Sequence, residues 1–226
     1  MAQIVVQNVT KIYPVGGLSI DAVKDASLSV ERGDFISIVG HSGSGKTTLL
    51  SIIGGITNPS SGDILFENMN IASLESDRLS EYRSRKIGFM FQFASLLPML
   101  TVRENLLLPT VFSGTGGLRE RAGSKADDLI RRVGLADKIN AYPAQLSGGQ
   151  QRRVAIARAF MNAPSLILAD EPTGDLDEET ERDMMSFFRN MNKESGTTFI
   201  MVTHNTDLAK QASRRFRMHQ GSIIEE

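Results

Sequence analysis

The sequence contains no cysteine, and no apolar run in it reaches the length of a membrane-spanning helix. The absence of cysteine excludes disulfide bonds, thiolate nucleophiles and cysteine-ligated zinc. A membrane-spanning helix needs about 18 apolar residues in a row, so any role of this chain at a membrane requires a partner. The first residues, MAQIVVQNVTKIYP, lack the charged and apolar regions of a secretory signal, which favours the cytoplasm.

Neither sign of charge is in excess, because 25 Lys and Arg stand against 26 Asp and Glu. Dedicated nucleic-acid-binding proteins usually carry a basic excess, so we expect no nucleic-acid partner. Of the 226 residues, 41% are hydrophobic and 23% are charged, which is typical of a globular chain and argues against disorder. A chain of this length can bury a large core within one domain.

Short apolar stretches of strand length alternate with helical stretches along much of the chain, which predicts an α/β fold with a mainly parallel sheet covered on both faces. The expected strands are 3–9, 34–39, 62–67, 87–91, 166–169 and 197–202. The expected helices are 46–53, most of 101–162 with breaks at 113–117 and 142–143, and 178–193. The helical block in the middle of the chain is expected to be an inserted subdomain.

Residues 40–47 read GHSGSGKT and match the phosphate-binding loop pattern G-x-x-x-x-G-K-[ST]. Glycines let backbone N–H groups wrap an anion, and the following helix adds its N-terminus. We expect Lys46 to reach the β and γ phosphates of a nucleotide and the Thr47 hydroxyl to ligate Mg²⁺. The alternative is a Gly-Ser connection with a solvated lysine, but the apolar strand before the loop favours phosphate binding. The predicted nucleotide-binding residues here are Gly40, Ser42, Gly43, Ser44, Gly45, Lys46, Thr47 and Thr48.

An apolar stretch, 166–169, is followed directly by Asp170 and Glu171. A strand that ends in Asp places a carboxylate at the edge of the sheet where open α/β folds bind ligands. We expect Asp170 to hold Mg²⁺ and Glu171 to polarise an attacking water. An acidic turn after a strand would give the same sequence pattern. The presence of the phosphate-binding loop favours the catalytic interpretation over a simple turn.

A second glycine motif, LSGGQQ at 146–151, precedes the helix-like segment RRVAIARAF. Ser147, Gly148 and Gly149 at a helix N-terminus would form a second anion site. One nucleotide does not need two such sites from one chain, whereas two chains facing head to tail would use both. For Ser-Gly-Gly alone, a plain helix cap is the simpler explanation.

The phosphate-binding loop, LSGGQ and LILADEP, in this order, resemble the nucleotide-binding subunit of an ATP-binding cassette (ABC) transporter over essentially the whole chain. The resemblance implies a P-loop NTPase (RecA-like) core with a small N-terminal antiparallel β subdomain and an inserted α-helical subdomain. Within a single domain of 1–226, the core would be 1–91 and 161–226, and the helical signature subdomain 92–160. It also implies an ATPase that uses ATP and Mg²⁺, dimerises with ATP bound, and is a monomer without it.

The same resemblance assigns roles to single residues. Tyr13 resembles the aromatic residue that stacks on adenine, Gln92 the glutamine that contacts the metal site and relays to the membrane partner, and His204 the histidine that contacts the γ-phosphate. Residues 174–177, GDLD, resemble the D-loop at the dimer interface. Asp175 and Asn205 depart from the commonest residues, which are Asn or Ala and Asp respectively.

Three groups of site residues follow from these assignments. The catalytic group is Glu171, His204 and Gln92, and the metal group is Thr47, Gln92 and Asp170. Nucleotide contacts in addition to the phosphate-binding loop are expected from Tyr13, Ser147, Gly148, Gly149, Gln150 and Asp175.

Stretches 85–109, 142–160 and 169–177 are similar to the lipoprotein-releasing, macrolide-exporting and cell-division branch of the family (LolD, MacB and FtsE types). This branch implies an integral-membrane permease partner with a large extracytoplasmic domain, and a position at the inner face of the plasma membrane. The apolar residues around Gln92 suit docking of a partner helix, unless they pack within the helical subdomain. They are Phe91, Phe93, Leu96, Leu97, Met99 and Leu100.

Two other functions share these motifs. A non-transport ABC ATPase of DNA repair, chromosome maintenance or translation would be stimulated by DNA or ribosomes rather than by membranes. A regulatory ABC ATPase would activate an extracytoplasmic hydrolase through a membrane partner without moving cargo.

Overall fold

The computed structural model describes residues 2–112, 119–174 and 176–226. One of its two sheets is antiparallel and has the strand order β2-β1-β4-β5. Its strands are β1 (Ala2–Val15), β2 (Leu18–Glu31), β4 (Ser61–Phe66) and β5 (Met69–Asn70). This sheet is the N-terminal antiparallel subdomain that the family resemblance predicts, although β1 is longer than the expected strand and β2 was not expected from the local pattern.

The second sheet has six strands in the order β10-β9-β3-β8-β7-β6. The strands are β3 (Phe35–Val39), β6 (Ile87–Met90), β7 (Leu166–Asp170), β8 (Thr198–Thr203), β9 (Arg214–His219) and β10 (Ser222–Glu225). All neighbouring strands are parallel except β10, which is antiparallel to β9. The predicted mainly parallel sheet is therefore confirmed.

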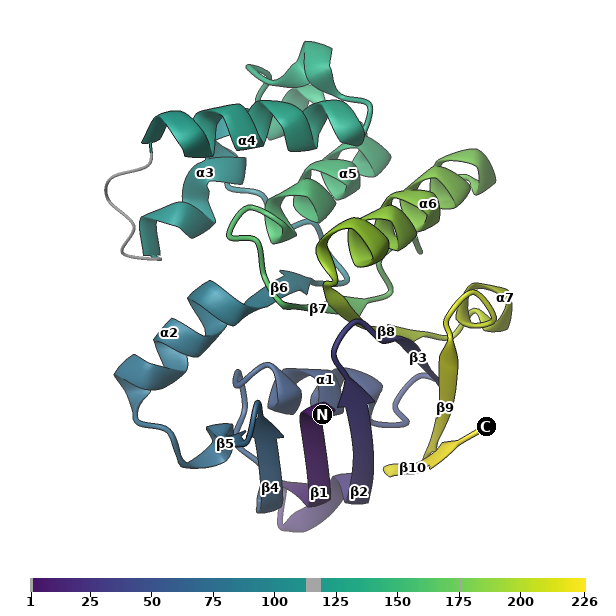
Figure 1. Cartoon of the computed structure of the whole chain (residues 1–226). Helices are drawn as coiled ribbons and strands as arrows, with labels where there is room; N and C mark the ends of the chain where they lie inside the picture. Colours follow the sequence, from purple (N-terminus) through teal and green to yellow (C-terminus); the bar gives the residue numbers. More distant parts are fainter. Residues whose placement is uncertain (1, 113–118, 175) are drawn as a thin grey trace.

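Three helices of the described chain form a group of their own, and the others lie nearer the two sheets (Figure 1). Helices α3 (Val102–Phe112), α4 (Arg119–Arg132) and α5 (Gly148–Ala159) lie together at the end of the molecule away from the antiparallel sheet. The other helices are α1 (Lys46–Ile53), α2 (Ser76–Lys86), α6 (Glu178–Ser195) and α7 (Thr206–Ala209), with short 3₁₀ turns at Ile71–Ser73, Ala136–Lys138 and Pro143–Gln145. The break expected at 142–143 is confirmed, whereas the one at 113–117 lies outside the described residues. No helix in the described part of the chain is both long and apolar enough to cross a membrane.

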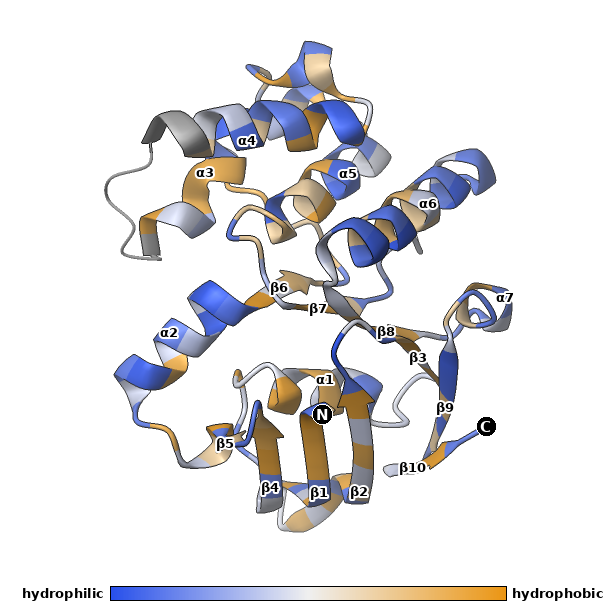
Figure 2. Cartoon of the chain, viewed as in Figure 1, coloured by the Kyte–Doolittle hydropathy of each residue, from blue (hydrophilic) through white to orange (hydrophobic). Residues whose placement is uncertain are grey.

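The six-stranded sheet separates two apolar cores, because successive side chains of a strand point to opposite faces. Ile36, Ile38 and Val202 belong to the core that contains α1 and the antiparallel sheet. Phe35 and Phe199 belong to the core on the other face, which contains α3, α4, α5 and α6. Figure 2 shows the corresponding hydrophobic stretches in the strands and the mostly hydrophilic visible faces of α2 and α6.

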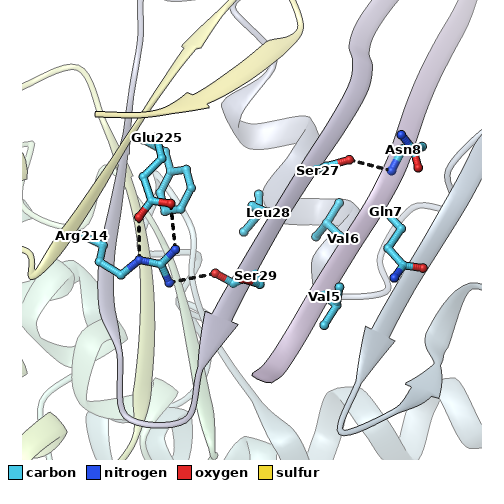
Figure 3. A pocket seen from close by; sticks show the side chains of 10 residues that line it. Val5, Val6, Gln7, Asn8, Ser27, Leu28, Ser29, Arg214 and Glu225 are labelled. Atoms are coloured by element: carbon cyan, nitrogen blue, oxygen red, sulfur yellow. Dashed lines mark hydrogen bonds and ion pairs between the residues drawn. The ribbon is translucent and has the colours of Figure 1, made fainter. Parts of the chain in front are cut away.

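The two sheets meet along a hollow of about 490 Å³ beside β1, β2 and β9 (Figure 3). Arg214 donates hydrogen bonds to Glu225 at 2.7 and 3.0 Å, to the Ser29 carbonyl at 2.9 Å and to Asp34 at 3.0 Å. The positive charge of the guanidinium group is therefore balanced by the carboxylates of Glu225 and Asp34. The hydrogen bond from Arg214 holds the pKa of Glu225 below its ordinary value. This hollow lies between the two sheets, and none of the predicted site residues lines it.

Candidate active site

The segments that leave β3, β6, β7 and β8 at their carboxyl ends surround a cavity of about 760 Å³. Since these four strands are neighbours and parallel, their carboxyl ends meet at one edge of the sheet, where open α/β folds bind ligands. The predicted residues that line the cavity are Ser42, Gly43, Ser44, Gly45, Lys46, Thr47, Thr48, Gln92, Asp170, Glu171 and His204. His41, Phe93, Gly174 and Ile20–Ala22 of β2 complete the lining.

The glycines of the phosphate-binding loop allow it to pass close to other backbone segments. Gly45 has φ +105°, and a Cβ built on it would lie 2.1 Å from the carbonyl oxygen of Ala22. A Cβ on Gly40 would lie 2.3 Å from the carbonyl oxygen of Met218. The loop then leads into α1, whose first N–H groups have no partner within the helix and suit an anion.

Lys46 is buried at the start of α1, and its Nζ donates to the carbonyl oxygens of Gly40 at 2.7 Å and His41 at 3.0 Å. Burial lowers the pKa of Lys46, while the negative charges of Glu171 and Asp170 act in the opposite direction. The ammonium group is thus held inside the loop that would surround the phosphates.

Thr47 and Asp170 form the pair of oxygen ligands expected for a metal. The Thr47 hydroxyl donates to Asp170 Oδ2 at 2.8 Å. Burial raises the pKa of Asp170, and the hydrogen bond from Thr47 opposes this rise. No cluster of three or more His, Cys, Asp or Glu suited to a metal occurs in the described residues. Two protein oxygens beside a phosphate site nevertheless fit Mg²⁺, which binds through few protein ligands plus phosphates and water.

Glu171 is in direct contact with His204. Glu171 Oε1 accepts hydrogen bonds from His204 N and His204 Nδ1, both at 2.8 Å, and Oε2 accepts one from the Thr203 hydroxyl at 2.9 Å. The Glu171 backbone has φ +46° and donates its N–H to the Val202 carbonyl at 3.0 Å. A non-glycine residue in this region is strained, and such strain is held in place by surrounding contacts at functional sites.

Arg152 of α5 connects the cavity to the helical layer, and sequence analysis missed it. It is 3% exposed and donates to the carbonyl oxygens of Phe91 at 2.7 Å and Pro172 at 2.8 Å, and to those of Gln92 and Glu171. It therefore joins the segment after β6 to the segment after β7. Its spacing from buried Ile156, four residues later on the same helix, is the signal that places it on the inner face.

The structure does not bring every predicted residue to the cavity. Tyr13 is 38% exposed and pairs in register with Ile20, which lines the cavity, while Lys11 Nζ lies 5.0 Å from the Tyr13 ring centre. Ser147 caps α5, residues 148–150 form its first turn, and none of these four residues lines the cavity. There Ser147 Oγ accepts from Gln150 N at 3.2 Å, and Gln150 Oε1 accepts from Ser147 N at 2.9 Å. Asp175 lies outside the described residues.

The proteins to which this chain is similar include a separate ATP-binding subunit and a fused ATP-binding/permease protein. The lipoprotein-releasing system ATP-binding protein LolD of Bordetella pertussis is 42% identical over 96% of this chain and 93% of its own length. The macrolide export ATP-binding/permease protein MacB of Rhodopirellula baltica is 41% identical over 96% of this chain but only 32% of its own length. The chain thus spans about a third of the length of the MacB relatives that it matches.

Solved structures agree with this result. The dimeric ATP-binding cassette MJ0796, in a post-hydrolysis state bound to ADP and Pi, is 40% identical with a TM-score of 0.94 and covers 99% of this chain and 97% of that one. The family model described as ABC transporter matches residues 23–174. The chain therefore belongs to the ABC transporter family and has the fold of its ATP-binding cassettes.

Proposed function

We propose that this chain binds and hydrolyses ATP with Mg²⁺, and that closure of two copies over ATP powers a membrane transport complex. The observation that carries the proposal is a cavity at the carboxyl edge of the sheet, which brings Lys46, Asp170, Glu171 and His204 together. The ADP and Pi in the post-hydrolysis structure of MJ0796 support hydrolysis as the reaction of this cassette type.

The predicted catalytic, metal and phosphate-binding residues of the cavity have separate roles in this reaction. Lys46 and the loop amides bind the β and γ phosphates, and Glu171 accepts a hydrogen bond from the attacking water. His204 contacts the γ-phosphate from the end of β8. Thr47, Asp170 and Gln92 would hold Mg²⁺, which when bound supplies charge neutralisation for the phosphate oxygens.

The position of residues 147–150 supports a head-to-tail dimer. They begin α5 outside the cavity of their own chain, so they are free to reach the nucleotide of a second copy. The two structures of MJ0796 to which this chain is similar are both dimers. In this arrangement residues 92–160 form the helical signature subdomain, 1–91 and 161–226 form the core, and Tyr13 stacks on adenine beside Ile20.

An apolar surface around Gln92 supports docking of a permease. Phe91, Phe93 and Met99 are 47%, 74% and 75% exposed, which disagrees with packing inside the helical subdomain. Leu97 is also exposed, whereas Leu96 and Leu100 are half-buried. An apolar surface beside a catalytic residue suits a partner helix. Such docking would hold the chain at the inner face of the plasma membrane through its partner.

The variant Glu171→Gln tests the reaction. The amide keeps the shape of the carboxylate but is a poor base, so turnover should fall by at least about 100-fold. ATP affinity should stay close to that of the parent protein. Steady-state phosphate release and nucleotide titration measure the two quantities, and hydrolysis by the variant at the parent rate would show that Glu171 is not the base.

Membrane stimulation separates a membrane complex from the functions in DNA repair, chromosome maintenance or translation. The proposal predicts that the ATPase responds to membranes containing its partner and not to DNA or ribosomes. LolD and MacB, the named relatives, are a lipoprotein-releasing ATP-binding protein and a macrolide export protein, which supports transport over a nucleic-acid role.

A further inference from the structure

Thr203, the last residue of β8, is fully buried and its hydroxyl contacts the catalytic carboxylate. Thr203 Oγ1 lies 2.9 Å from Glu171 Oε2. In the parallel register of the sheet it stands beside Val39, the last residue before the phosphate-binding loop. The side chain is therefore fixed between the two segments that would hold the phosphates and the attacking water.

The direction of the Thr203 hydroxyl hydrogen follows from its second partner. The backbone N–H of Asn205 donates to Thr203 Oγ1 at 3.0 Å. An N–H group is only a donor, so the hydroxyl oxygen must be the acceptor in that bond. The one hydroxyl hydrogen remains available for Glu171 Oε2, and the Asn205 amide keeps it aimed there.

Counting acceptor positions shows what remains on Glu171. An ionised carboxylate has about four lone-pair positions, two on each oxygen. His204 N and Nδ1 use both positions on Oε1, and Thr203 uses one on Oε2. The remaining position is on Oε2, the oxygen that Thr203 orients.

We infer that Thr203 is a positioning residue, whose hydroxyl holds Glu171 Oε2 in the orientation that receives a hydrogen bond from the attacking water. This inference rests on the proposed role of Glu171 as the base. Without the hydroxyl, only Oε1 stays bonded, and Oε2 loses the contact that fixes the rotation of the carboxylate. Misplacement of a reacting group by about 1 Å can lower a rate by about 100-fold.

Two substitutions separate the hydroxyl from the packing of Thr203. Thr203→Val keeps the volume and removes the hydroxyl, whereas Thr203→Ser keeps the hydroxyl and removes a buried methyl group. We expect kcat to fall by about 10- to 100-fold in Thr203→Val, with the KM for ATP within about twofold of the parent. Thr203→Ser should keep kcat close to the parent value while its Tm is lowered by the lost methyl group.

A control addresses the loss of a buried hydroxyl from β8 as such. Thr198, the first residue of β8, is also fully buried, and its Oγ1 accepts from Gly33 N at 2.8 Å and donates to Gln3 Oε1. Thr198→Val removes a hydroxyl with a similar pair of partners, at the end of the strand away from the cavity. Its kcat should stay close to that of the parent, so a loss seen in Thr203→Val does not arise from the general loss of a buried hydroxyl in this strand.

The outcomes distinguish this inference from the proposed function. A Thr203→Val enzyme with parent kcat, beside an inactive Glu171→Gln enzyme, would overturn the inference and leave the function intact. Equal loss of kcat in Thr203→Ser and Thr203→Val would also overturn it, because the effect would then follow packing. Hydrolysis by Glu171→Gln at the parent rate would also overturn the inference, by showing that Glu171 is not the base, whereas absence of ATP hydrolysis by the parent protein would overturn the proposed function itself. In the Glu171→Gln background, Thr203→Val should cause no further loss, as expected for residues that act as one unit.

Discussion

Lys46 illustrates how one side chain is prepared for an anion before any nucleotide binds. Its ammonium group lies among carbonyl oxygens, and burial lowers its pKa. Lys46→Ala removes the one cation of the phosphate-binding loop, so ATP affinity should fall by at least about tenfold, as expected for a lost charge-assisted contact. Equilibrium titration with ATP measures the change. Unchanged affinity would refute the role given to this loop.

Substitution of Arg152 should lower the stability of the fold as well as turnover, because its partners are backbone carbonyl groups rather than a ligand. In Arg152→Met these buried acceptors lose their donor, and leaving buried carbonyl oxygens without a donor costs about 1–3 kcal/mol. The free energy of unfolding in urea should fall by about that amount, and turnover with it, since Gln92 and Glu171 lose their common support.

The adjacent Arg153 provides the matched control. It donates one hydrogen bond to the Val133 carbonyl, at 3.1 Å, away from the cavity. Arg153→Met should lower the free energy of unfolding by about 1 kcal/mol and leave turnover close to the parent. If the two substitutions lower turnover equally, Arg152 has no specific role in supporting the active site.

The site residues that the sequence predicts lie close together along the chain, whereas the ones it misses act on residues far away in the sequence. The phosphate-binding loop can be predicted from the sequence because all its functional atoms come from one short segment. Arg152 reaches Phe91, 61 residues away, and Thr203 reaches Glu171, 32 residues away. Their roles arise only when the sheet brings β6, β7 and β8 together, so neither role could be deduced from spacing along the chain.

At the scale of the elements, the cap of α6 predicts a pH dependence. Asp177 precedes this 18-residue helix, and its side chain accepts from Thr180 N at 3.0 Å and Thr180 Oγ1 at 2.8 Å. These hydrogen bonds lower the pKa of Asp177 in the folded state. The cap therefore stabilises the fold above the pKa of an unfolded Asp, about 3.9, and this contribution is lost as the pH falls through the lower folded value.

Asp177→Ala should consequently lower the Tm near neutral pH, and the difference from the parent should shrink as the pH approaches and passes below about 3.9. Thermal unfolding at a series of pH values gives this difference directly. Asn205→Ala, which removes an uncharged cap from α7, should show no such trend. A difference for Asp177→Ala that stays constant with pH would contradict the charged-cap explanation.

Strand β9, one of the elements that sequence analysis missed, is stabilised mainly by its neighbours. Strand β9 reads RRFRMH, and only Phe216 and Met218 of it are buried, so its composition does not indicate a strand. Pairing with β3 in register provides the structure. Strands β3, β7 and β8 are buried throughout and consist mostly of apolar residues, which is why their positions were predicted almost to the residue.

At the scale of the whole molecule, the separation of residues 147–150 from the cavity predicts an ATP-dependent dimer. In the Glu171→Gln background, ATP should convert the monomer to a dimer, measurable by light scattering after gel filtration. Adding Ser147→Arg should block the dimer by placing a bulky cation at the proposed interface. The ATP affinity of the monomer should not change, because Ser147 does not line its own cavity. A loss of monomer affinity would contradict the head-to-tail arrangement.

The exposed apolar surface around Gln92 predicts where a membrane partner docks. An exposed methionine on the antiparallel sheet, far from this surface, provides a matched control. Met99 is 75% exposed beside this surface, and Met69 is 44% exposed on the antiparallel sheet. Met99→Lys should abolish recovery of a membrane protein with the tagged chain from gently solubilised membranes, since a charge opposes docking of an apolar helix. Met69→Lys should not, and both variants should bind ATP like the parent. If both variants recover the membrane protein equally, the permease docks elsewhere.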